Sequence, residues 1–457
     1  MSAEVNTDPS VRSAYSADAS GLAMTPDGVA RPESAEEVAE LLSRAVVDRT
    51  PITAAGGQTS TTGASITDAG TLLSTRGLSK IIDIDKAART MRVESGVLVG
   101  DLKRAAAAEG LLFPPDPTSE EESTIGGAIA CNASGARSLK YGATRPHIRA
   151  LKVALASGEI VELRRPLLEK NTVGYAFAQD AMDWFIGSEG TLGVVIEAEL
   201  ALLPLPEEVT GIAFPFADEA KAIEFVVAAR MSESVNPRCL EYFDELAFAI
   251  ARMVDYQPGW AANASAMVYV EEEAGIGSDG ENILDRWIAI AEEFGADEDA
   301  RVFQGEAQLR HARKMRHNVP ATMNERGGRH REGGGRKVST DWAVPYARLG
   351  EMVALARKIT RDAGLEQAVI YGHAGNGHPH QNFIARDAGE LAAIQKVVEE
   401  ILGSVVASGG TVAAEHGIGK LKRKWVGMQM SALQIAVMRA VKQELDPLHL
   451  LAPGNIL

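Results

Sequence analysis

The chain has 457 residues, 46% of them hydrophobic, and a formal net charge of −16. This length exceeds one hydrophobic core and predicts two or three domains, while the acidic balance argues against nucleic-acid partners and a basic membrane-binding face. Two widely spaced cysteines fit no metal-binding pattern, and neither a signal peptide nor a membrane-spanning run is evident. We therefore expect a cytoplasmic protein with reduced thiols, and a peripheral contact with the inner membrane stays open.

The first predicted elements surround a loop of small residues. A helix is expected from about residue 34 to 48, with Ser34 as N-cap and Glu37 as its capping-box partner. A strand over 51–56 then enters the loop GGQTSTTG at 56–63. Successive backbone N–H groups in such a loop can bind a pyrophosphate, and the alternative interpretation is a plain connecting loop.

More glycine-rich loops follow in the first 200 residues. Strands are predicted at 78–86 and 90–96, and a helix at 99–109 ends before Gly110. The long loop 111–144, a hairpin over 151–163 and the loop 187–193 come next. Three loops rich in glycine, serine and threonine suggest a large ligand, for which a dinucleotide is the economical candidate.

The middle of the chain, about 206–403, alternates apolar strands with amphipathic helices. Within it, the segment 308–329 is strongly basic in an acidic protein. Such a segment is usually a solvated face, but it also suits an anionic substrate or cofactor phosphates. The GxGxxG match at 275–280 follows three consecutive glutamates, which would repel a pyrophosphate, so we interpret it as an ordinary loop.

Histidines gather in the stretch YGHAGNGHPHQN at 371–382. Of nine histidines in the chain, His373, His378 and His380 fall here, and Glu415 and His416 follow in AEHGIGK. Imidazole and carboxylate groups suit a divalent ion such as Zn²⁺ or Mn²⁺, and the glycines allow His373 and His380 to converge. Glu415 and His416 can serve one site only from irregular backbone. A hairpin turn without a metal is the alternative interpretation.

These motifs occur in the same order in a known family. The chain resembles FAD-linked 2-hydroxy-acid dehydrogenases of the vanillyl-alcohol oxidase superfamily, which include D-lactate dehydrogenase, D-2-hydroxyglutarate dehydrogenase and the glycolate oxidase flavin subunit. The resemblance covers about residues 31–457. It implies an α+β fold, with a PCMH-type FAD-binding domain at 1–205 and an antiparallel-sheet substrate domain, the FAD-linked oxidase C-terminal domain, at 206–410. A C-terminal segment, 411–457, would return to the FAD domain.

The resemblance also implies the cofactor contacts. The FAD pyrophosphate would lie on the loop from Gly56 to Gly63, and the remaining contacts would come from the other glycine-rich loops and the tail. The implied FAD-binding residues are Gly56, Gly57, Gln58, Thr59, Ser60, Gly63, Pro117, Thr118, Gly126, Gly127, Asn132, Ser134, Gly135, Tyr141, Gly142, Glu189, Gly190, Gly193 and Asn455. Covalent attachment of the flavin, for which His147 is a candidate, stays open.

The catalytic roles implied by the resemblance concern the histidine cluster and the basic segment. The metal ligands would be His373, His380 and Glu415, the base would be His416, and the substrate contacts would be Arg316, Lys337 and Asn382. The family's hairpin usually reads Asp-Gly-Asn where this chain has Asn376, Gly377 and His378. That departure bears on the identity of the metal.

The expected activity is FAD-dependent, metal-assisted oxidation of a small anionic D-2-hydroxy acid, D-lactate-like, to its 2-oxo acid. Electrons would pass to a quinone, a cytochrome, an electron-transfer flavoprotein or an iron–sulfur subunit. Alternatives are a flavin transferase like alkyl-dihydroxyacetonephosphate synthase, the flavin subunit of a multi-subunit glycolate oxidase, or a binding protein without turnover. The particular acid, the metal, the acceptor and whether the chain forms a homodimer stay open.

Overall fold

The computed structural model describes residues 4–255, 259–274 and 280–457. The chain forms two compact units. The first, called the flavin unit because the sequence predicts that it binds FAD, comprises the chain up to Gly135, residues 142–205 and residues 415–457. The second, called the sheet unit, comprises residues 136–141 and 206–414. The GxGxxG match at 275–280 falls almost entirely outside the described residues.

The flavin unit contains two main sheets within its described residues. One is parallel, with strand order β1-β3-β2, and the other is antiparallel, with order β4-β5-β9-β7-β8. A short pair, β10-β6, accompanies them. The strands are β1 (Gly28–Ala30), β2 (Ile52–Ala55), β3 (Thr71–Ser74), β4 (Ile81–Asp85), β5 (Thr90–Glu94), β6 (Leu111–Leu112), β7 (Ile148–Ala154), β8 (Ile160–Arg164), β9 (Val194–Ala201) and β10 (Leu203–Pro204).

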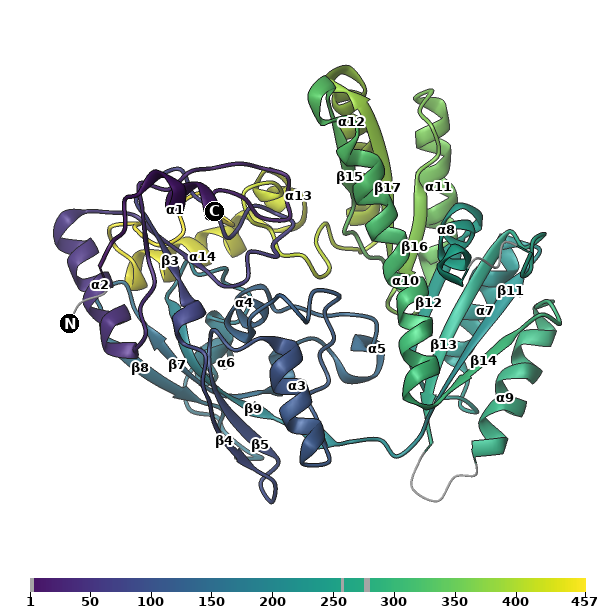
Figure 1. The fold of residues 1–457 in the computed structure, drawn as a ribbon, viewed down its shortest axis with the longest axis horizontal. Coiled ribbons are helices and arrows are strands. Elements are labelled where there is room, and N and C mark those ends of the chain that lie inside the picture. The colour runs from purple at the N-terminus through teal and green to yellow at the C-terminus, as the bar shows by residue number, and fades with distance from the viewer. Residues whose placement is uncertain (1–3, 256–258, 275–279) are drawn as a thin grey trace. The chain divides into compact units, whose positions relative to one another are not determined.

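Helices flank these sheets (Figure 1). They are α1 (Pro9–Ala14), α2 (Ala35–Asp48), α3 (Val99–Ala108), α4 (Ile125–Cys131), α6 (Ala176–Gln179), α13 (Val426–Gln429) and α14 (Ala432–Leu445). One core packs α3 and α4 against β5, β7 and β9, and another packs α2 against β2, β3 and β9. The sequence predicted α3 and its end at Gly110, whose φ is +73°.

The N-terminus of α2 corrects one expectation. The Ser34 side chain accepts from the Glu37 N–H, as predicted. The Glu37 carboxylate, however, accepts from the Glu33 N–H instead of the Ser34 N–H. The reciprocal half of the capping box is therefore displaced by one residue, because a Glu side chain can reach either of two adjacent donors.

The sheet unit is built on a seven-stranded sheet, counting described residues only. Its order is β14-β11-β13-β12-β16-β17-β15, and its pairings are antiparallel, as the sequence predicted. The strands are β11 (Val209–Phe216), β12 (Pro237–Asp244), β13 (Ala266–Glu273), β14 (Arg301–Gln304), β15 (Gly334–Ser339), β16 (Val369–His373) and β17 (His378–Asp387).

Helices pack on both faces of this sheet (Figure 1). On one face lie α8 and α10, which pack on Phe243 and Tyr371; on the other lies α7, whose Glu219 accepts from the Tyr242 hydroxyl. The alternation of Tyr242 and Phe243 along β12 follows the period of two of a strand. The helices are α5 (Ser138–Tyr141), α7 (Glu219–Met231), α8 (Glu245–Ala251), α9 (Gly280–Glu293), α10 (Gly305–Gly328), α11 (Leu349–Asp362) and α12 (Ala388–Ala407). No described helix combines the length and apolarity needed to cross a bilayer.

A buried charge cluster attaches α5 to this sheet. Glu271 on β13 lies 2.7 Å from Arg238 Nε and 3.4 Å from Arg137 Nε, and it accepts from the Tyr269 hydroxyl at 2.9 Å. Burial alone would raise the pKa of Glu271, but the two guanidinium groups lower it to about 2. The Glu271 carboxylate therefore binds the segment 136–141 to the sheet, and it neutralises charge on two buried cations.

Replacing Glu271 by glutamine is expected to lower the free energy of unfolding by about 3–5 kcal/mol at pH 7, because two buried cations lose their counter-charge. A carboxyl group with a depressed pKa stabilises the fold above about pH 4.5, and this contribution disappears as the pH falls towards 2. Urea titration at pH 7 and at a pH near 2 measures the free energy of unfolding of both proteins.

The matched control for this variant is Glu273→Gln. Glu273 lies on the same strand, and its ion pair with Lys140 is partly exposed. Partly exposed pairs contribute about 0–1 kcal/mol. If the two variants lost the same free energy of unfolding, the buried cluster would contribute no more to stability than the partly exposed ion pair.

Candidate functional site

The loop after β2 has the character of an anion site. In the described part of the chain, the backbone N–H groups of residues 57–61 donate no hydrogen bond. Gly56 and Gly57 lie tightly against Thr124 and Glu122, where a Cβ atom would come within 2.1 Å and 2.0 Å of an oxygen. Five consecutive backbone donors without a protein partner, on a loop packed this closely, suit an anion such as a phosphate group.

The predicted cofactor residues of the long loop surround the short helix α4. Thr124 caps this helix by accepting from the Gly127 N–H, and Asn132 ends it in the left-handed conformation, with φ of +49°. The Asn132 side chain accepts from the Arg145 N–H at 2.9 Å. Pro117, Thr118, Gly126, Ser134, Gly135 and Gly142 belong to the flavin unit, whereas Tyr141 belongs to the segment that packs with the sheet unit.

Glu189 connects two predicted motifs within the flavin unit. Its carboxylate accepts from the Ile418 N–H at 2.5 Å and from the Gly419 N–H at 2.8 Å. Burial raises the pKa of Glu189, and these two donors oppose that shift. Gly190 and Gly193 follow it and lie against Ala54 and Val153. The loop GSEGTLG therefore holds the turn that follows Glu415 and His416.

The C-terminal tail joins the same region. Asn455 donates to the Ala64 carbonyl at 2.9 Å and accepts from Lys420 Nζ at 2.8 Å. The Lys420 N–H also donates to the Thr62 carbonyl at 2.9 Å. The loop at 56–63, the AEHGIGK turn and the tail are thereby joined in one network.

Replacing Glu189 by alanine is expected to raise the exchange rates of the Ile418 and Gly419 amide hydrogens about a hundredfold. Two charge-assisted hydrogen bonds contribute about 3 kcal/mol together, and each 1.4 kcal/mol is a factor of ten. Hydrogen–deuterium exchange mass spectrometry of the peptide 413–425 measures this. Glu197→Ala, which removes a carboxylate from the exposed face of the adjacent β9, is the control; unchanged exchange in Glu189→Ala would contradict the assigned role.

His147 is buried beside Phe113, with ring centroids 6.2 Å apart. Burial lowers the pKa of His147 to about 4, so the imidazole is neutral at pH 7.

The hairpin of β16 and β17 places three histidines on one face of the sheet unit. His373 pairs with His378 and Tyr371 pairs with His380, and paired or alternate positions share a face. Each of the three imidazoles offers one donor atom, and these atoms lie within 4.8 Å of one another. All three side chains are buried, at 3–4% exposure.

A carboxylate and a guanidinium group lie next to this histidine face. His373 Nδ1 lies 2.6 Å from Glu241 Oε1, and Arg316 Nε on α10 lies 3.3 Å from Glu241 Oε2. Burial alone would raise the pKa of Glu241, but His373 and Arg316 lower it to about 2. Glu241 therefore holds the imidazole and the guanidinium group at fixed positions as an ionised carboxylate.

The predicted substrate contacts lie on the same face as the histidines. Arg316 stacks over the Tyr371 ring at 5.2 Å, and Lys337 Nζ on β15 donates to Asn324 on α10 at 2.7 Å. Burial and the nearby Arg316 charge lower the pKa of Lys337 to about 8. The buried Asn382 Oδ1 has no hydrogen-bond partner among described residues. Two neighbouring cations suit an organic anion.

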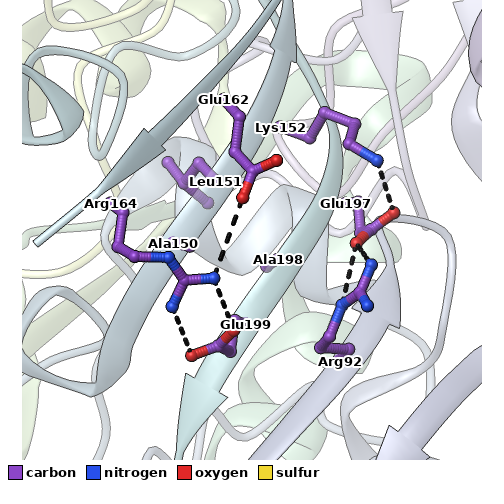
Figure 2. A pocket seen from close by; sticks show the side chains of 9 residues that line it. All are labelled: Arg92, Ala150, Leu151, Lys152, Glu162, Arg164, Glu197, Ala198 and Glu199. Atoms are coloured by element: carbon purple, nitrogen blue, oxygen red, sulfur yellow. Dashed lines mark hydrogen bonds and ion pairs between the residues drawn. The ribbon is translucent and has the colours of Figure 1, made fainter.

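A hollow on the exposed face of the five-stranded sheet does not resemble a binding site. Its charged side chains pair with one another (Figure 2), with Lys152 Nζ 3.2 Å and Arg92 Nη2 2.5 Å from Glu197, and Arg164 Nη2 2.8 Å from Glu199. Because these charges satisfy one another, the hollow presents no residual charge to a ligand.

Comparison with known protein families gives two matches that together cover nearly the whole chain. Residues 26–164 match the family described as FAD binding domain, and residues 205–456 match FAD linked oxidases, C-terminal domain. The chain is 30% identical to the glycolate oxidase subunit GlcD of Bacillus subtilis, covering 97% of this chain and 92% of the relative. It belongs to the FAD-linked oxidase family.

The D-lactate dehydrogenase of Anaerostipes hadrus is also 30% identical, over 94% of this chain and 90% of the relative. A solved alkyldihydroxyacetonephosphate synthase superposes with a TM-score of 0.73 at 20% identity, covering 98% of this chain and 82% of that one. The latter likeness shows the fold alone. The chain is thus an FAD-linked oxidoreductase with the α+β architecture that its sequence predicted.

The residues of this FAD-linked oxidase fit both expected groups. The unsatisfied N–H groups of residues 57–61 suit the FAD pyrophosphate. The three convergent imidazoles, with a carboxylate behind His373, suit a divalent transition metal. Glu415 follows Ala414, whose N–H donates to the Asp341 carbonyl at 2.8 Å, and its own Oε2 accepts from Ser134 at 3.3 Å.

Two carboxylates of the oxidase's histidine face were missed at the sequence level. Glu241 approaches His373, and Asp341 Oδ1 lies 3.1 Å from His378 Nε2. The available signal for Glu241 is a carboxylate between Leu240 and Tyr242 in the middle of strand β12. Asp341 follows β15 in irregular backbone, and only the folded chain brings it to the hairpin.

Proposed function

We propose that this oxidoreductase converts a D-2-hydroxy acid to the 2-oxo acid with the help of a divalent metal ion, and passes the electrons to an external acceptor. The observation that carries the proposal is the shared face of the sheet unit. Three imidazole donors and the cations Arg316 and Lys337 lie on it, in a chain whose family binds FAD. The names of the relatives, a glycolate oxidase subunit and a D-lactate dehydrogenase, support the substrate class.

When bound, FAD accepts the hydride that leaves the substrate Cα, and a divalent ion lowers the pKa of the substrate hydroxyl. Arg316 binds the substrate carboxylate, and Lys337 adds positive charge beside it. Asn382, a buried amide on the same face, is a further substrate contact. These contacts fix the orientation of the Cα–H bond, which can supply several kcal/mol of the barrier.

The proton of the substrate hydroxyl passes to a ring nitrogen of His416. Its Nε2 lies 3.4 Å from Glu415 Oε1, and its carbonyl accepts from Thr62 Oγ1 at 3.4 Å. Gly417, at φ of +73°, gives the irregular backbone that the sequence predicted here. We assign His373, His380 and Glu415 as metal ligands and His416 as the catalytic base.

Replacing Arg316 by methionine is expected to raise KM for the hydroxy acid about 30-fold or more, because a buried contact between charged groups is worth at least about 2 kcal/mol. Steady-state kinetics of the flavin-loaded enzyme measures this. Lys314→Met, on the exposed side of the same helix, is the control and should leave KM unchanged. An unchanged KM in Arg316→Met would remove Arg316 from the substrate contacts.

The proposed reaction is tested by anaerobic addition of D-lactate, D-2-hydroxyglutarate, D-malate, glycolate and L-lactate to the flavoprotein. Loss of the flavin absorbance with a D-hydroxy acid, but not with L-lactate, is the expected result. A flavin that none of these acids bleaches would contradict the proposal and favour the transferase chemistry of the structural relative.

A further inference from the structure

The third histidine of the hairpin has an unusual environment. His378 is 4% exposed, and its Nε2 makes no hydrogen bond with described residues, although Asp341 Oδ1 lies 3.1 Å away. The two atoms are close enough for an ion pair but are not aligned for a hydrogen bond. A buried ring nitrogen in this state can accept a further ligand without breaking a hydrogen bond.

The backbone leaves His378 little freedom. Gly377 has a φ of +69°, and a Cβ atom there would lie 1.9 Å from the Val344 carbonyl oxygen. The Val344 N–H donates to the Gly377 carbonyl at 3.0 Å, which joins this turn to the neighbouring segment. His378 is therefore held opposite His373 by a turn that only glycine can form.

The ring of His378 lies among the other two imidazoles. Its centroid is 5.5 Å from that of His373 and 4.6 Å from that of His380, and the latter two are 5.3 Å apart. The Glu241 carboxylate lies behind His373, and the Asp341 carboxylate lies beside His378. Two carboxylates next to three imidazoles can balance the charge of a dication.

We propose that His378 is a further metal ligand, so that this chain binds its ion with three imidazoles from one hairpin. The inference rests on the proposed metal centre and adds a donor to it. Three imidazoles select a borderline first-row ion such as Zn²⁺ or Co²⁺ over Mg²⁺ or Ca²⁺, which prefer oxygen ligands. A structural ion pair between His378 and Asp341 is the competing explanation.

X-ray absorption spectroscopy of the zinc-loaded holoenzyme counts the imidazoles directly and needs no variant. The expected count is three, and a count of two would overturn the inference while leaving the centre of His373 and His380 intact. A wild-type protein that binds no ion would instead contradict the proposed function itself. The two failures are thereby distinguished.

The variant test uses His378→Asn, with His449→Asn as the control because His449 is exposed and lies in the flavin unit. Zn²⁺ is titrated into chelator-treated flavoprotein against a competing dye. His378→Asn is expected to weaken Zn²⁺ binding about a hundredfold and to lose one imidazole from the absorption spectrum, with unchanged flavin content. Unchanged affinity in a folded variant would support the ion pair and overturn the inference.

Discussion

Replacing His373 by alanine is expected to lower kcat/KM for the D-2-hydroxy acid by about a thousandfold or more, with FAD still bound. A Lewis acid beside the reacting hydroxyl contributes several kcal/mol, and each 1.4 kcal/mol is a factor of ten. His373 is also the imidazole that Glu241 orients at 2.6 Å. Its loss would therefore remove a proposed metal ligand, and it would leave the buried Glu241 carboxylate with one partner fewer.

The His373→Ala enzyme is assayed for bound metal by elemental analysis, for flavin by its visible spectrum, and for turnover with an artificial electron acceptor. His449→Ala, in which an exposed imidazole is lost, should match the wild type in all three. Full activity without bound metal would exclude His373 from the catalytic centre and would remove metal assistance from the proposed mechanism.

Replacing His416 by glutamine is expected to lower kcat by about 10²–10⁴-fold, the usual contribution of a positioned general base. Glutamine keeps a polar side chain of similar length but cannot accept the hydroxyl proton at pH 7. Flavin and metal contents should be unchanged, because Glu415 and the hairpin histidines remain. The measurement is the rate of flavin reduction in a single anaerobic turnover.

The pH profile separates a base from a merely structural His416. In the wild type, the reduction rate should fall on the acidic side as the imidazole becomes protonated, and this limb should disappear in His416→Gln. A variant that retains the acidic limb at a lower rate would show that another group accepts the proton.

Local patterns predicted much of the fold. The strands predicted at 78–86 and 90–96 and the helix predicted at 99–109 correspond to β4, β5 and α3, because the patterns that mark them depend on neighbours in sequence. The hairpin histidines were predicted to converge, and pairing of Tyr371 with His380 brings this about. Side chains alternate between the two faces of each strand, so the register of β16 with β17 is enough to place these side chains on one face.

What the sequence did not reveal depends on contacts between distant segments. Glu241 and Asp341 reach the hairpin only through the order of strands in the sheet, which no local pattern encodes. Segment 136–141 reads as part of the glycine-rich cofactor loop, yet Arg137 packs in the sheet unit against Glu271. Glu271, the charged partner that binds this segment to the sheet unit, lies on the distant strand β13. The residues next to Arg137 in sequence therefore do not indicate where it packs.

Metal assistance of flavin reduction is tested most directly by removing and restoring the ion. The flavoprotein is stripped with a chelator, dialysed, mixed anaerobically with the D-2-hydroxy acid that bleaches the untreated enzyme, and followed at the flavin band by stopped flow. We expect the stripped enzyme to reduce its flavin at least about a hundredfold more slowly, with full recovery on addition of Zn²⁺ or Mn²⁺. If enzyme verified to be metal-free reduced its flavin at the wild-type rate, metal assistance of the reaction would be contradicted.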